Sequence, residues 1–139
     1  MMTAQEISDR IEIADLLTVY TRAIDTAEWD ALDNVFTPDA LIDYTSAGGI
    51  AGSYPEVKAW LAVALKEFVR RQHILGQLAV RLDGDTAHVT AYFTNPMISL
   101  NENEAGEFFY CGGYYHHDLV RTGQGWRSRQ LIEETVWTR

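Results

Sequence analysis

The second half of the chain, from residue 71 onward, is a succession of long extended segments separated by turns. This pattern limits the possible folds most strongly. It predicts strands over residues 72–82, 86–100, 108–121 and 126–138. Asp83-Gly84-Asp85 predicts a tight hairpin turn, and residues 122–125 predict another. We therefore expect a meander of long antiparallel strands.

Two features predict that this sheet is strongly curved. Pro96 lies inside the second strand, where its missing amide hydrogen requires a bulge or an edge. Gly112-Gly113 marks a bend at which another backbone approaches closely. The polar segment 101–107 is expected to form a solvated loop between the second and third strands.

The first half of the chain predicts three helices. Thr3 and Glu6 form a capping box, and apolar residues then recur at helical spacing to about Ile24. Ser53 and Glu56 form a second capping box, which opens a helix with an apolar face up to residue 68.

The third expected helix is short and lies between these two. Asp25 and Glu28 are its candidate caps, Phe36 belongs to its apolar face, and Pro38 ends it. A short strand is expected over residues 40–45.

Together these elements predict one α+β domain over residues 1–139, which is a normal domain length. The strongly curved, mixed or antiparallel sheet would form a cone covered by the three N-terminal helices. Helices that cover one face of a curved sheet leave a hollow, and such hollows bind ligands. We expect this domain to enclose a single, mostly apolar pocket.

Net charge and cysteine content restrict the kinds of partner and the compartment that we expect for the protein. The net charge is −9, which disfavours nucleic acid and anionic membranes because phosphate binding needs clustered Lys and Arg. The single cysteine, Cys111, excludes an internal disulfide and suits the reducing cytoplasm, where we expect the protein. No segment resembles a signal peptide or a membrane span. The expected partner is a small hydrophobic molecule or another copy of the chain.

His73 is the candidate general base, because imidazole is the side chain that titrates near neutral pH without special help. Strand alternation would place His73 and Leu75 on one face and Leu78 on the other. Asp25 is the candidate carboxylate that orients the imidazole. The alternatives are a half-buried strand histidine and a helix-capping aspartate.

Three tyrosines could point hydroxyl groups into the hollow and hold a substrate oxygen: Tyr20, Tyr44 and Tyr115. Tyr20 and Asp25 converge only if the helix ends or bends near Asp25, since five residues rotate by about 140° on a helix. The alternative is that these tyrosines only fill the core.

The remaining candidates concern substrate binding. Small residues on one face of the third long strand would leave space for a ligand. The residues expected to bind substrate are Tyr115, Trp29, Leu75, Phe93, Met97, Cys111 and Gly113. The chain lacks the HxH, HExxH and CxxC spacings of metal sites, so we expect no metal and no cofactor.

With these residues in view, the chain resembles the SnoaL-like branch of the nuclear-transport-factor-2-like superfamily from about Thr3 to Thr138. The resemblance is carried by the order and spacing of several short motifs. These are Ile13-x-x-Leu16-Leu17-x-x-Tyr20, Asp25-x-x-x-Trp29-Asp30-x-Leu32, Val35-Phe36-Thr37-Pro38-Asp39-Ala40, Asp43-Tyr44, Gln72-His73, Leu82-Asp83-Gly84-Asp85-Thr86-Ala87, Gly113-x-Tyr115 and Gly125-Trp126-Arg127.

Within this branch the chain is similar to the group of scytalone dehydratase, bile-acid 7α-dehydratase and hexachlorocyclohexane dehydrochlorinase. The resemblance implies a cofactor-free lyase whose Asp/His dyad is Asp25 and His73. It also implies pocket tyrosines at Tyr44 and Tyr20. Dimers and trimers both occur in this group, so we expect a homodimer or a homotrimer, formed through the outer face of the sheet.

The leading hypothesis is a dehydratase that acts on a small hydrophobic hydroxy-carbonyl compound. His73 would remove a proton α to the carbonyl group, Asp25 would hold the imidazole, and a tyrosine would bind the substrate oxygen. An isomerase or cyclase begins with the same proton abstraction. A non-catalytic binding or assembly module is the alternative of a different class.

Overall fold

The computed structural model describes residues 1–99 and 107–139. The loop expected over residues 101–107 therefore lies, except for Glu107, outside the described residues. The elements, in which η denotes a 3-10 helix, are α1 (Ala4–Asp25), η1 (Trp29–Asn34), β1 (Phe36–Asp43), η2 (Thr45–Ala47), β2 (Ala51–Ser53), α2 (Tyr54–Ala64), η3 (Leu65–Glu67), β3 (Phe68–Arg71), β4 (Ile74–Asp83), β5 (Thr86–Ser99), β6 (Glu107–Thr122) and β7 (Gly125–Thr138).

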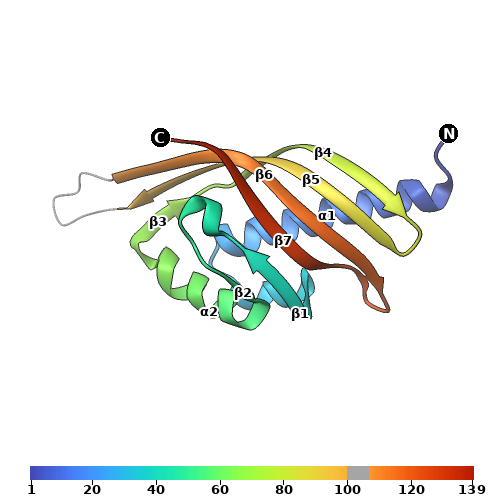
Figure 1. Cartoon of the computed structure of the whole chain (residues 1–139), viewed down its shortest axis with the longest axis horizontal. Coiled ribbons are helices and arrows are strands. Elements are labelled where there is room, and N and C mark those ends of the chain that lie inside the picture. Colours follow the sequence, from blue (N-terminus) through green and yellow to red (C-terminus); the bar gives the residue numbers. More distant parts are fainter. Residues whose placement is uncertain (100–106) are drawn as a thin grey trace.

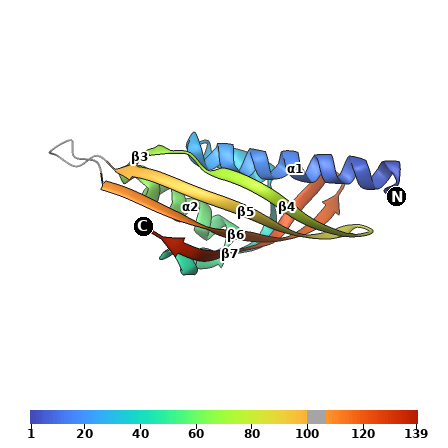
Figure 2. The same cartoon turned by 90° about the horizontal axis from the view of Figure 1, so that it is seen from above.

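The strands form one curved, mixed sheet. Its order is β2-β1-β7-β6-β5-β3, and β4 also pairs with β5. Strand β1 runs parallel to β7, whereas the other pairs are antiparallel. The long strands run the length of the molecule, and α1 lies along one face of the sheet (Figures 1 and 2). This confirms the expected α+β fold with helices on a curved sheet.

Two of the register shifts in the sheet fall at positions for which the sequence made a prediction. The β6–β7 register shifts between Gly112 and Gly113, as the sequence predicted. A Cβ atom on Gly113 would lie 1.9 Å from the carbonyl oxygen of Glu134, so only glycine permits this approach. The β4–β5 register shifts between Leu75 and Leu78. This second bulge turns Leu78 to the same side as Leu75, and the expected alternation through this strand was therefore wrong.

The strand expected over residues 72–82 is broken into β3 and β4. Strand β3 ends at Arg71, opposite Met97, and β4 begins at Ile74, opposite Thr94. Pro96 faces the break, where its missing amide costs one hydrogen bond at an existing interruption. The pairing of β5 with β6 continues through Pro96, while the break leaves Pro96 without a strand partner on the other side of β5, like a residue at an edge.

The expected second helix is shorter than predicted. It is the 3-10 helix η1, which no side chain caps, so the capping role of Asp25 was wrong. Phe36 belongs to β1, where it pairs with Ser128 and is 2% exposed. Pro38 lies in β1 where the register to β7 is irregular, and this position tolerates a residue without an amide hydrogen.

The capping boxes had different outcomes. Thr3 and Glu6 cap α1 reciprocally. Ser53 stands at the start of α2 but makes no side-chain cap, and Pro55 occupies the first turn instead. Proline is favoured there because its fixed φ already suits a helix.

A buried ionic cluster attaches the start of α1 to the hairpin of β6 and β7. Asp9 is 3% exposed and accepts hydrogen bonds from both terminal nitrogens of Arg121 at 2.8 and 2.9 Å. The Trp126 indole also donates to Asp9, at 3.1 Å. Hydrogen bonding by Arg121 outweighs burial and lowers the pKa of Asp9 to about 2. The N-terminal part of α1 is thus fixed by this cluster, whereas its C-terminal part lines the cavity described below.

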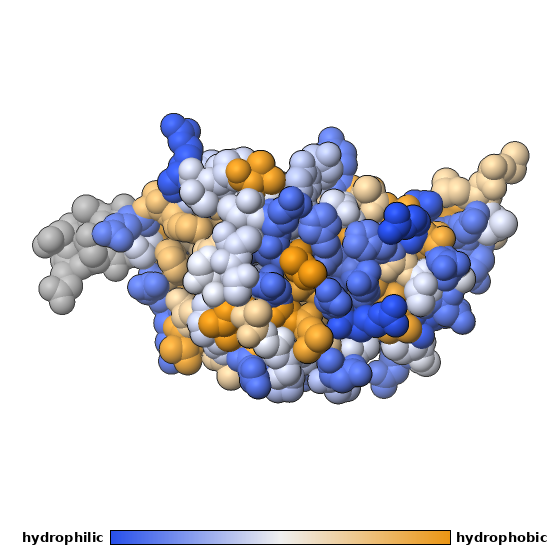
Figure 3. Space-filling model, in the orientation of Figure 1, coloured by the Kyte–Doolittle hydropathy of each residue, from blue (hydrophilic) through white to orange (hydrophobic). Residues whose placement is uncertain are grey.

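The surface carries apolar residues in separate places. The face seen in Figure 3 is a mosaic of hydrophilic residues and small hydrophobic patches. Phe108, Tyr92 and Trp137 are among the exposed large side chains of the long strands. In the part of the chain that the structure describes, no helix is long and apolar enough to cross a membrane.

Candidate active site

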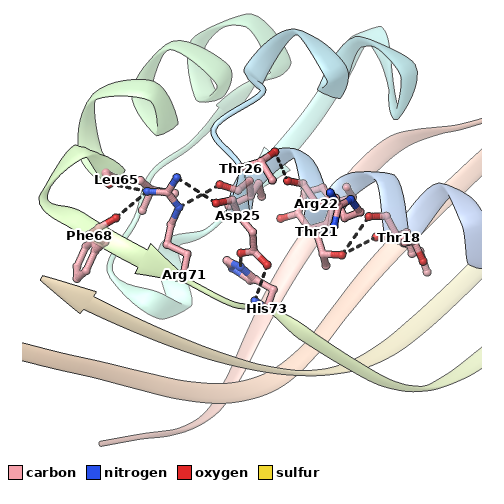
Figure 4. A network of polar contacts seen from close by, with 12 residues as sticks. Thr18, Thr21, Arg22, Asp25, Thr26, Leu65, Phe68, Arg71 and His73 are labelled. Atoms are coloured by element: carbon pink, nitrogen blue, oxygen red, sulfur yellow. Dashed lines mark hydrogen bonds and ion pairs between the residues drawn. The ribbon is translucent and has the colours of Figure 1, made fainter.

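Asp25 and His73 meet where the end of α1 passes the break between β3 and β4 (Figure 4). The Nδ1 atom of His73 lies 2.6 Å from Oδ1 of Asp25. The backbone amide of His73 donates to Oδ2 of the same carboxylate at 2.8 Å. The two carboxylate oxygens of Asp25 thus bind both the backbone and the ring of His73. The backbone bond fixes the position of the residue, and the ring contact fixes the rotation of the imidazole.

This arrangement depends on where two elements end: α1 ends at Asp25, and β3 ends at Arg71, two residues before His73. The backbone of Thr26 closes the last turn of α1. The early end allows Tyr20 and Asp25 to serve the same site. The side chain of His73 is 5% exposed and that of Asp25 is 20% exposed, so the pair is shielded from most of the solvent.

The imidazole borders a cavity of about 250 Å³. Its wall combines the C-terminal half of α1, the segment after β1, helix α2 and the inner face of the sheet. The lining residues are Tyr20, Ile24, Tyr44, Ala47, Gly48, Gly49, Trp60, Leu61, Ala64, Leu65, Glu67, Phe68, His73, Asn95, Met97, Phe109, Tyr115 and Glu133.

The three predicted tyrosines come together in this wall. The Tyr20 and Tyr44 hydroxyls lie 2.5 Å apart, and the Tyr20 and Tyr115 rings pack edge to face. Burial raises the pKa of each of these three tyrosines well above its usual value. They therefore remain neutral near pH 7 and can donate hydrogen bonds to a ligand oxygen.

Glu133 is the chief polar residue of the cavity that the sequence reasoning missed. It lies on β7 and is 7% exposed. Burial raises the pKa of its carboxyl to about 7, although a hydrogen bond from Tyr115 lowers it; nearby Asp43 raises it further. Strand alternation in β7 could have indicated that Glu133 points inward, because Leu131 and Glu133 are buried on either side of exposed Ile132.

Asn95 is a second polar residue that the sequence reasoning did not identify. It is 6% exposed and lines the cavity from β5. Its side-chain oxygen has no hydrogen-bond partner among the described residues. Met97, which was expected at the site, lines the cavity two residues further along the same strand.

Five expected substrate-binding residues do not line this cavity, for different physical reasons. Phe93 is stacked on Tyr115 with ring centroids 3.9 Å apart, and thus lies behind the wall. Cys111 is fully buried, and burial raises the pKa of its thiol to about 12, as expected for inert packing. Gly113 packs against the backbone of β7.

The other two of these residues belong to the surrounding structure. Trp29 lies under the guanidinium of Arg71, 5.9 Å from its carbon. Leu75 is partly buried against the core next to the β4 bulge. Among residues 1–99 and 107–139, no group of three or more His, Cys, Asp or Glu side chains is arranged to hold a metal ion.

Comparison with known proteins assigns the chain to a family. The SnoaL-like domain profile matches residues 5–132. An uncharacterized protein of Mycobacterium tuberculosis is 46% identical over 133 residues, which cover 96% of this chain and 89% of that protein.

Solved structures show the same fold at low sequence identity. The Kfla4162 protein of Kribbella flavida has a TM-score of 0.86 at 22% identity, covering 95% of this chain and 93% of that one. A protein of Novosphingobium aromaticivorans, provisionally named a scytalone dehydratase, has a TM-score of 0.87 at 16% identity, covering 99% and 91%. A type 2 hexachlorocyclohexane dehydrochlorinase has a TM-score of 0.81 at 17% identity, covering 96% and 88%. The chain therefore belongs to the SnoaL-like domain family, with the nuclear-transport-factor-2-like fold.

Proposed function

We propose that this protein is a cofactor-independent lyase, a dehydratase that removes water from a small hydrophobic hydroxy-carbonyl compound. The observation that carries the proposal is the 2.6 Å contact between Asp25 and His73 at the wall of the cavity. A carboxylate that accepts the Nδ1 proton leaves Nε2 of the imidazole unprotonated, which is the form of a general base.

In the proposed reaction, Nε2 of His73 takes a proton from the carbon next to the substrate carbonyl. Asp25 holds the ring and stabilises the imidazolium that forms. Tyr20 and Tyr44 share a hydrogen bond, so one of the two hydroxyls donates to the carbonyl oxygen as it gains negative charge. A positioned base contributes about 10²–10⁴-fold to the rate.

The cavity wall favours a neutral substrate. None of the described residues that line it is Lys or Arg, so a carboxylate or phosphate group would find no countercharge. Apolar side chains such as Trp60, Leu61 and Phe68 suit a hydrophobic ring or chain. Two structural neighbours carry names of elimination enzymes, a scytalone dehydratase and a hexachlorocyclohexane dehydrochlorinase, and these names support a lyase.

The proposal is tested with a panel of small hydroxy-ketones and hydroxy-acyl thioesters, incubated with the wild type and His73→Ala. Mass spectrometry of the products should show the loss of one water with the wild type only. Products of unchanged mass would make the protein an isomerase or cyclase. Binding without turnover across the panel would favour the non-catalytic module.

The oligomeric state is a second part of the proposal. Phe108, with 54% of its surface exposed, and the half-buried Tyr110 and Tyr114 lie together on β6. We propose that this face forms a homodimer or homotrimer. Light scattering of the wild type and Phe108→Asp should show an assembly that dissociates in the variant.

A further inference from the structure

Glu133 is a buried carboxyl group that the reaction described above leaves unused. It lies on the inner face of β7, on the wall of the same cavity as His73. A buried acid that faces a ligand cavity is costly unless it is neutral or paired. No Lys or Arg is among the described residues of this wall.

The sheet order separates Glu133 from the base. Glu133 pairs with Tyr115 on β6, Tyr115 pairs with Ala91 on β5, and His73 lies beyond β5 at the break between β3 and β4. Three strand spacings, together with an offset of about four residues along the strands, put the two backbones roughly 19 Å apart before curvature and inward side chains shorten the gap. The two side chains thus approach the cavity from different sides, with room for a small molecule between them.

We propose that Glu133 is the general acid of this site, and that it protonates the hydroxyl group that leaves the substrate. This inference rests on the proposed function. His73 Nε2 takes the Cα proton, the electron pair of that bond forms the carbon–carbon double bond, and the Cβ–O bond breaks. The Glu133 proton joins the departing oxygen, so the products are an unsaturated carbonyl compound and water. Proton exchange with solvent then restores both residues.

The neighbours of Glu133 support this role. Burial raises its pKa to about 7, so that a substantial fraction is protonated at neutral pH. The groups that face it are Tyr20 from α1, Tyr115 and Cys111 from β6, and Asp43 and Tyr44 at the end of β1. The tyrosines are weaker acids, since burial raises their pKa values further. A carboxylic acid is the better donor to a departing hydroxide.

The test compares two probes that differ in their need for an acid. Dehydration of 4-hydroxy-4-phenylbutan-2-one expels hydroxide, which must be protonated. Elimination of 5-nitrobenzisoxazole needs the same base but releases a stabilised phenolate. Glu133→Gln should lower the first rate by about 100-fold or more and the second by much less. The matched control is Glu134→Gln, because Glu134 points to the outer face and contacts His116; it should change neither rate.

The outcomes separate the two proposals. Dehydration by Glu133→Gln at the rate of the wild type, or equal losses with both probes, would overturn the role of Glu133 as an acid. Retention of both reactions by His73→Ala would instead overturn the proposed function.

A third measurement needs no substrate. A carboxyl whose pKa is raised by folding destabilises the folded state as pH rises through that pKa. Between pH 4.5 and about 7 the wild type should therefore lose thermal stability that Glu133→Gln retains. Identical pH dependence in the two proteins would mean that Glu133 is ionised at neutral pH, and the inference would fail.

Discussion

Arg71 donates a hydrogen bond from Nε to the carbonyl oxygen of Ile24 at 3.0 Å, and this bond joins the helix end that carries Asp25 to the segment that leads to His73 (Figure 4). Ile24 directly precedes Asp25 in α1, and Arg71 lies two residues before His73. Nη1 of the same guanidinium binds the carbonyl oxygens of Leu65 at 3.0 Å and Phe68 at 2.7 Å. Arg71 is thus a positioning residue that fixes the end of α1 against β3.

Replacing Arg71 with Ala should lower kcat without abolishing folding. The bonds that fix α1 beside His73 would be lost, and the dyad would sample longer distances. The expected loss is about 10-fold or more in kcat, with a small change in KM. Steady-state kinetics and the His73 imidazole signals in NMR would report it. Arg70→Ala is the control, because Arg70 is exposed on the same strand and should retain the activity of the wild type.

Replacing Asp25 with Asn should preserve the shape of the site but remove its chemistry. An amide can donate to Nδ1, which would place the imidazole proton on Nε2 and block the base. We expect turnover to fall by about 10²–10⁴-fold. Nitrogen NMR of the imidazole should show the exchange of tautomers. Asp30→Asn is the matched control because Asp30 is exposed on η1; an Asp25→Asn enzyme as active as this control would exclude the orienting role.

Replacing Gly113 with Ala should be strongly destabilising. The new Cβ would lie 1.9 Å from the carbonyl oxygen of Glu134, so β6 and β7 would have to separate at the bulge. The expected loss is about 3 kcal/mol in the free energy of unfolding, measured by urea denaturation. Gly123→Ala is the control, since no atom lies within 4 Å of its added Cβ. Equal stability of the two variants would refute the close approach.

The folded protein should lose thermal stability in acid, because Asp9 becomes protonated there. Its pKa is about 2 in the folded protein, below the ordinary value of 3.8. A lowered pKa stabilises the folded state above pH 3.8, and this contribution disappears as the pH falls towards 2. Thermal unfolding between pH 6 and 2 should show a steeper decline for the wild type than for Asp9→Asn. Parallel curves would mean that the carboxylate of Asp9 contributes nothing through Arg121.

Local patterns in the sequence were sufficient for the order of the main elements. The Thr3 capping box, the hairpin turn at Gly84 and the bend at Gly113 are each set by a few neighbouring residues. Phe36 shows where this reasoning stops. Its helical spacing was real, but pairing with β7 and complete burial favoured a strand.

The site was partly predictable, but not from local patterns. The contact between Asp25 and His73 spans 48 residues, and it was inferred from residue chemistry and the family resemblance. Leu75 was misplaced because the break between β3 and β4 and the bulge that follows it interrupt strand alternation. Gly113 does not line the cavity because it packs against the backbone of β7. Glu133 lay within reach of the alternation in β7 but was not among the predicted site residues.

The most direct test of the account is the rate at which the protein breaks the α-carbon–hydrogen bond of its best hydroxy-ketone substrate. Turnover should be slower when that position carries deuterium. His73→Ala should lose about 100-fold or more of the activity, while the surface variant His88→Ala keeps it. Full activity in His73→Ala, with the same isotope effect as the wild type, would contradict the claim that His73 takes the proton.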